Sequence, residues 1–139
     1  MCTTPHPADP SRTYLHIPMN DVDHIAPHIE KIINFIDNAH QSNGTVLVHC
    51  SLGINRSASA VIAYLCHHNK INSTEALAFL TTKKNDVLPC TLFLKQIDRY
   101  FQRKASGKDP LGGGGFPRNI RARKIGGGFT LNHRRNPSG

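Results

Sequence analysis

Residues 49–57, His-Cys-Ser-Leu-Gly-Ile-Asn-Arg-Ser, hold the side chains whose types and spacing could do chemistry. Arg56 follows Cys50 by six positions, and Gly53 lies between them. A cysteine thiolate is a nucleophile, and an arginine guanidinium presents a planar fork of N–H donors that matches two oxygens of a phosphate. The spacing therefore predicts a nucleophile that faces a bound tetrahedral anion.

The elements around this stretch predict how the two groups are positioned. Residues 45–49 indicate a short buried strand, and the small and apolar residues of 57–68 indicate a helix. A helix N-terminus offers unpaired backbone N–H groups and the positive end of a dipole, and a loop wrapped over it can aim more N–H groups at one point. Gly53 allows the positive φ that such a loop tends to need. A cysteine in this field should have a lowered pKa and exist largely as thiolate.

Two other interpretations of Cys50 fit its surroundings less well. A cysteine after an apolar strand is usually a small buried side chain with no chemical role. The presence of His49, Gly53 and Ser57 around Cys50 makes it less consistent with a motif that arose by chance. A zinc site would need a nearby partner pattern such as Cys-x2-Cys or His-x3-His, and the sequence has none close to Cys50. Neither a metal nor a cofactor is expected.

The pattern His49-Cys50-x5-Arg56-Ser57 resembles the signature of the cysteine-dependent protein phosphatases, and its loop is most similar to that of the dual-specificity branch. The resemblance covers about residues 14–102. Asn55 stands where that branch more often has Ser or Gly, and Cys90 stands where an Asn commonly follows the Pro. The matching segments are Tyr14-Leu15-His16-Ile17-Pro18 with Asp21, Phe35-Ile36-Asp37, Arg56-Ser57-Ala58, Ala63-Tyr64-Leu65, Thr74-Glu75-Ala76-Leu77, and Phe93 with Gln96-Ile97.

The resemblance implies a role for each residue of the site. Cys50 would attack phosphorus, and Asp21 would protonate the leaving group, with Asp23 as its local competitor. Ser57 would hydrogen-bond the sulfur, and His49 would order the loop. The oxygens of the phosphoryl group would be bound by the backbone N–H groups of the loop and by the guanidinium. This phosphate-binding set is Ser51, Leu52, Gly53, Ile54, Asn55 and Arg56.

The expected fold class is α/β, with a protein tyrosine phosphatase-like fold whose incomplete central sheet is flanked by helices. Residues 1–13 are expected to be irregular, and 14–104 to form the catalytic domain without its early strands. Apolar residues at helical spacing predict a helix over 26–41, and further helices are expected after the caps Ser73 or Thr74 and after Pro89. A second strand is expected over 14–17.

Residues 105–139 are expected to be a disordered Gly/Arg-rich tail. Of the seventeen Lys and Arg residues of the chain, nine lie in 103–139, together with one of the nine acidic residues, so this region accounts for the net charge of +8. Nine of the eleven glycines lie there as well. Binding of nucleic acid or of an acidic partner by the tail is the less favoured interpretation, because Phe116 and Phe129 are its only aromatic residues.

The sequence thus predicts a hydrolase of protein phosphotyrosine and phosphoserine/threonine. The alternative is an inactive phosphatase-like fragment that binds phosphoproteins or other partners. No apolar run approaches the ~20 residues of a membrane span, and the N-terminus lacks the pattern of a signal peptide. The four cysteines, at positions 2, 50, 66 and 90, show no disulfide spacing. Since a thiolate enzyme needs a reducing compartment, we expect the cytoplasm or nucleus.

Overall fold

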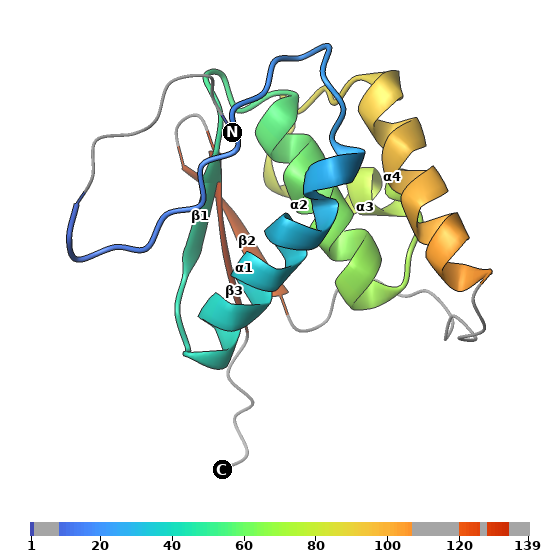
Figure 1. Ribbon diagram of the computed structural model, residues 1–139. Coiled ribbons are helices and arrows are strands. Elements are labelled where there is room, and N and C mark those ends of the chain that lie inside the picture. The colour runs from blue at the N-terminus through green and yellow to red at the C-terminus, as the bar shows by residue number, and fades with distance from the viewer. Residues whose placement is uncertain (2–8, 107–119, 126–127, 134–139) are drawn as a thin grey trace.

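The structure, a computed structural model, places a group of helices against one face of a small sheet (Figure 1). It describes residues 1, 9–106, 120–125 and 128–133. Because these residues form both helices and a sheet, the expected α/β fold class is confirmed. The elements of these residues, in chain order, are the 3-10 helix η1 (Ala26–His28), α1 (Ile29–Gln41), β1 (Val46–His49), α2 (Arg56–Asn69), α3 (Ser73–Lys83), α4 (Thr91–Ala105), β2 (Ile120–Ile125) and β3 (Gly128–His133).

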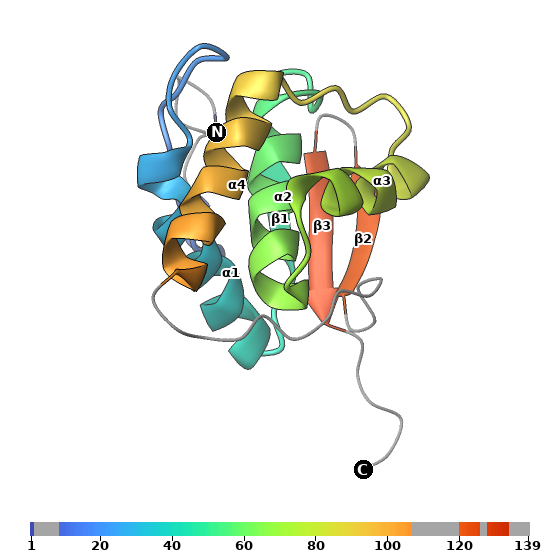
Figure 2. The same ribbon diagram turned by 90° about the vertical axis from the view of Figure 1, so that its right-hand side faces the viewer.

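Helix α2 is the centre of the structure. Every residue from Ser57 to Cys66 is buried, and α2 packs against α1, α3, α4, β1 and β3. Figure 2 shows α2 between α4 and the strands. The small residues of this helix, such as Ala58, Ala60 and Ala63, let neighbours approach it on all sides. The N-terminus of α2 is consequently held in place by the core rather than by its own turn alone.

The helices on either side follow the apolar pattern of the sequence, with differences at their ends. The helix expected over 26–41 begins as η1 and continues as α1. The N-cap of α3 is Asn72 rather than Ser73 or Thr74: its side chain accepts a hydrogen bond from the Glu75 N–H at 2.9 Å, and the Glu75 carboxylate accepts one from the Asn72 N–H at 3.1 Å. This capping box satisfies two backbone donors at once. None of the helices in the described residues is long and apolar enough to cross a membrane.

A hairpin from the C-terminal region supplies two of the three strands. β3 lies between β1 and β2, both pairings are antiparallel, and Val48 is opposite Phe129. The expectation that all of 105–139 is disordered is therefore wrong for 120–125 and 128–133. Phe129 and Leu131 are fully buried and complete the core over α2, a contribution that the Gly and Arg content of this region conceals. The rest of the predicted tail beyond Ser106 lies outside the described residues.

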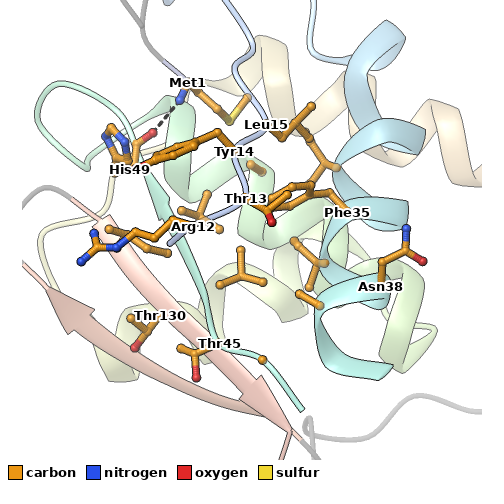
Figure 3. A pocket seen from close by; sticks show the side chains of 18 of the residues that line it. Met1, Arg12, Thr13, Tyr14, Leu15, Phe35, Asn38, Thr45, His49 and Thr130 are labelled. Atoms are coloured by element: carbon orange, nitrogen blue, oxygen red, sulfur yellow. Dashed lines mark hydrogen bonds between the residues drawn. The ribbon is translucent and has the colours of Figure 1, made fainter. Parts of the chain in front are cut away.

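The strand expected over 14–17 is not present. Residues 14–17 have neither helix nor strand structure, and β1 pairs with β3 alone among the described strands. A cavity of about 760 Å³ is lined by residues of this segment and of β1. Figure 3 shows the cavity, with Thr13 and Tyr14 drawn between His49 of β1 and Phe35 of α1. The Met1 ammonium group donates a hydrogen bond to the His49 carbonyl oxygen at 2.7 Å.

Candidate active site

The loop between β1 and α2 places Cys50 at the start of the most buried helix of the structure. Cys50 follows the last residue of β1 directly and is 7% exposed. Gly53 has φ = 72°, the left-handed conformation that the sequence predicts for it, and its N–H points at the Cys50 sulfur with an N–Sγ distance of 3.2 Å. Because residues with a Cβ rarely adopt this conformation, the glycine is what lets the loop turn its backbone toward the thiol.

Several donors surround the sulfur of Cys50. The Ser57 hydroxyl oxygen lies 3.3 Å from Sγ, and the backbone N–H groups of Leu52, Gly53 and Ser57 also favour the thiolate. Burial alone would raise the pKa of Cys50, but hydrogen bonds from Ser57 and from these backbone groups outweigh it and hold the pKa below its ordinary value. The surroundings of the thiol therefore favour a lowered pKa for Cys50, as the sequence predicts.

Arg56 is the first residue of α2, and its guanidinium lies along the loop. Its Nη1 donates to the Met19 carbonyl oxygen at 3.0 Å, and its Nη2 donates to the Ser51 hydroxyl at 3.2 Å. Its Nε lies 3.2 Å from Oδ1 of Asp21, but off the N–H direction, so this contact is an ion pair rather than a hydrogen bond. The side chain is 12% exposed, and its two hydrogen bonds orient the guanidinium.

The structure separates the two aspartates that compete for the acid's role. Asp21 reaches the loop: besides its ion pair with Arg56, its Oδ1 accepts a hydrogen bond from Nδ2 of Asn55 at 2.8 Å. Asp23 instead accepts from the Asn20 N–H at 2.6 Å and stabilises the turn of its own segment. Asp21 is therefore the aspartate that contacts the loop between β1 and α2.

The other predicted site residues take varied positions. Ser51 and Leu52 are exposed, and the Ile54 carbonyl oxygen accepts from the Leu88 N–H at 3.0 Å. His49 ends β1 and lines the cavity described above. That cavity does not include Cys50, Arg56 or Asp21.

Gln96 of α4 is a residue of this region whose contacts the sequence does not reveal. Its Oε1 accepts from the backbone N–H groups of Ile25 and Ala26 at 2.8 and 3.3 Å. It therefore satisfies two donors at the point where the segment that holds Asp21 continues into η1. Its Nε2 lies 3.1 Å from Nδ1 of His24. A polar residue next to Ile97 on the buried side of an amphipathic helix is the signal that could have indicated this anchor.

No group of three or more His, Cys, Asp or Glu side chains suited to a metal ion is found in the described part of the chain. Cys50, Cys66 and Cys90 are free thiols.

This α/β fold, with a cysteine loop at the N-terminus of its central helix, defines a protein of the phosphatase-like class. The sequence model of the dual-specificity phosphatase catalytic domain matches residues 2–103. The chain belongs to the dual-specificity phosphatase family.

Individual relatives agree with this assignment. Human dual specificity protein phosphatase 16 is 39% identical over 93 residues, which are 66% of this chain and 14% of the relative. Tyrosine-protein phosphatase yvh1 of Schizosaccharomyces pombe is 35% identical over 104 residues, 73% of this chain and 32% of the relative. The chain thus spans a third or less of these two curated relatives. The crystal structure of human DUSP28 superposes with a TM-score of 0.68 at 24% identity, over 75% of this chain and 74% of that one, and shows the same fold.

Proposed function

We propose that the chain hydrolyses phosphate monoesters on protein tyrosine and on serine or threonine through a cysteinyl-phosphate intermediate at Cys50. The observation that carries this proposal is the set of donors around the sulfur, from Ser57 and the N–H of Gly53, which lowers the pKa of Cys50 beside the guanidinium of Arg56. The family assignment supports the same chemistry.

In the first step, the Cys50 thiolate attacks phosphorus, and the bond from phosphorus to the leaving oxygen breaks. The electron pair stays on that oxygen, which takes a proton from the Asp21 carboxyl group. Backbone N–H groups of 51–56 and the Arg56 guanidinium stabilise the negative charge on the three other oxygens.

In the second step, water attacks the cysteinyl-phosphate. The Asp21 carboxylate takes a proton from that water, and the phosphorus–sulfur bond breaks to release inorganic phosphate. The electron pair returns to sulfur, where the Ser57 hydroxyl, at 3.3 Å, stabilises the departing thiolate. The nucleophile and the acid are thereby restored.

Phosphoproteins are the substrate class that we infer. Residues 51–55 contain no basic side chain, whereas phosphoinositide phosphatases of this superfamily tend to have basic residues in this loop. Since the mechanism needs a reduced thiol, we infer an intracellular reducing compartment, either the cytoplasm or the nucleus.

The test is hydrolysis of a small aryl phosphate and of phosphotyrosine and phosphothreonine peptides by the full chain. Cys50→Ser and Arg56→Lys are expected to abolish release of phosphate, and rapid acid quenching of the wild-type reaction is expected to trap phosphate on Cys50. Turnover that persists in Cys50→Ser would overturn the mechanism.

The second candidate is the binding module, an inactive phosphatase-like chain that captures phosphoproteins or other partners. The cavity along the edge of β1 favours it, because in the described structure this strand pairs with β3 alone. Saturable binding of a phosphopeptide by the wild-type chain without any release of phosphate would decide for this candidate.

A further inference from the structure

Asn55 occupies the N-cap position of α2, but its side chain does not cap that helix. Its backbone has φ = −112° and ψ = −70°, and the side chain makes no capping hydrogen bond. Asn is among the residues most favoured as N-caps because its side-chain oxygen can accept from the first turn. The amide of Asn55 is directed to other partners instead.

Both ends of this amide join separate segments to the loop that holds Cys50. Its Nδ2 donates to Oδ1 of Asp21 at 2.8 Å, and its Oδ1 accepts from the Cys90 N–H at 2.7 Å. Since a carboxylate only accepts and a backbone N–H only donates, the two partners fix the orientation of the amide. Asn55 thus links three parts of the chain: the segment that holds Asp21, the loop between β1 and α2, and Cys90, which precedes α4.

Asp21 depends on few contacts for its position. Its side chain is 60% exposed, and it lies on a segment without helix or strand. Arg56 holds that segment through the Met19 carbonyl oxygen, but its contact with Asp21 is an ion pair off the N–H axis. The hydrogen bond from Asn55 is the directional contact on the carboxylate.

We propose that Asn55 is a positioning residue, which holds the carboxyl group of Asp21 over the cysteine loop so that it can protonate the leaving group. This inference rests on the proposed function. With Oδ1 held by the amide, Oδ2 is the oxygen that carries the transferred proton. Because Asn55 acts through Asp21, its loss should matter most where the leaving oxygen is a strong base and needs protonation.

The experiment measures kcat for aryl phosphates with leaving groups of graded pKa. Asn55→Ala is expected to lower kcat by about 10-fold for the most basic leaving group, and by less than about 2-fold for the least basic one. Asn55→Asp is the sharper variant: its carboxylate can still accept from the Cys90 N–H but cannot donate to Asp21. Its kcat is expected to fall at least as much as that of Asn55→Ala, with the same dependence on the pKa of the leaving group.

A double-mutant cycle separates positioning from general damage. In the Asp21→Asn background, Asn55→Ala is expected to change kcat by less than about 2-fold, because the group through which it acts is gone. The matched control is Asn69→Ala at the other end of α2, whose side chain donates to the Leu65 carbonyl oxygen of its own helix, at 3.3 Å. A loss that is equal for all leaving groups, or that adds fully to Asp21→Asn, would overturn the inference.

Amide hydrogen exchange gives a readout that does not need turnover. Asn55→Ala is expected to speed exchange over residues 20–23 and at the Cys90 N–H, whereas Asn55→Asp should retain protection at Cys90 and lose it over 20–23. Unchanged exchange over 20–23 in both variants overturns the positioning role, even for a chain without activity. Failure of the proposed function appears differently, as turnover that survives Cys50→Ser or as an absence of phosphate release from the wild-type chain.

Discussion

The hydroxyl oxygen of Ser57 lies 3.3 Å from the sulfur of Cys50, and both side chains are buried at the start of α2. This contact is the largest of those that lower the pKa of Cys50 against the opposing effect of burial. The Ser57 hydroxyl thus stabilises the thiolate of Cys50, because a hydrogen-bond donor in a site shielded from water acts strongly on a neighbouring charge.

Ser57→Ala should therefore raise the pKa of Cys50 toward its ordinary value. A smaller fraction of the thiol is then ionised at mildly acidic pH, so the acidic limb of kcat/KM for an aryl phosphate should move to higher pH. We expect kcat to fall by about 10-fold or more, since breakdown of the cysteinyl-phosphate also loses its donor to sulfur. Ser57→Thr keeps a hydroxyl, so its acidic limb should lie at the pH of the wild type. An acidic limb that does not move in Ser57→Ala would contradict the effect of Ser57 on the pKa of Cys50.

The thiols of Cys50 and Cys66 should differ sharply in reactivity. Burial, together with the carboxylates of Asp98 and Glu75, raises the pKa of Cys66 to about 12, whereas that of Cys50 is lowered. Because only the thiolate is alkylated, iodoacetamide near neutral pH should modify Cys50 and leave Cys66 unmodified in the folded chain. Peptide mass spectrometry after timed quenching measures both rates, and a guanidinium-unfolded sample is the control in which they should converge. Comparable rates in the native chain would refute the difference.

The cysteine loop was predictable from sequence because its physics is local. Cys50, Gly53 and Arg56 lie within seven residues, between a strand and a helix that the neighbouring residues indicate. Gly53 has the positive φ that its position indicates. The apolar stripe of α1 was equally readable, since Ile29, Ile32, Ile33 and Ile36 are all buried.

The features that sequence did not predict depend on distant partners. Asn55 contacts Asp21 and Cys90, which are 34 and 35 positions away, so nothing near it indicates that its amide leaves the N-cap role. Strand β3 pairs with β1, about eighty residues upstream in the chain, and glycines and arginines around it dominate the composition. In such cases the pairing partner, not the segment's own sequence, decides the structure.

Asp98 of α4 stabilises the N-terminus of α3 across the helix–helix contact. Its carboxylate accepts from the Ser73 N–H at 3.0 Å and from the Ser73 hydroxyl at 2.7 Å. Asp98→Ala should lower the free energy of unfolding by about 1–3 kcal/mol, because the buried Ser73 hydroxyl loses its acceptor. Urea unfolding followed by circular dichroism measures this. Lys95→Ala, at an exposed position of the same helix, should change the free energy of unfolding by less than about 0.5 kcal/mol. An equal effect of both substitutions would argue against stabilisation of α3 by the contact between Asp98 and Ser73.

Phe129 tests whether the hairpin of β2 and β3 is part of the folded core. Its side chain is fully buried, and its strand pairs with β1 directly before the cysteine loop. Phe129→Ala should lower the free energy of unfolding by about 3–5 kcal/mol, since it removes a large side chain from a packed site. Arg123→Ala, at an exposed position of β2, is the matched control and should lie within about 0.5 kcal/mol of the wild type.

Gly128→Ala probes the same pairing without changing an apolar side chain. A Cβ at Gly128 would clash with the Val48 carbonyl oxygen and with Cβ of His49, so the backbone of β1 or β3 must move. Because His49 precedes Cys50 directly, this shift should reduce kcat as well as stability, while Arg123→Ala changes neither. If 128–133 did not pair with β1 in solution, Phe129→Ala and Gly128→Ala would both leave the unfolding midpoint unchanged, and the tail predicted from composition would be the correct description of these residues.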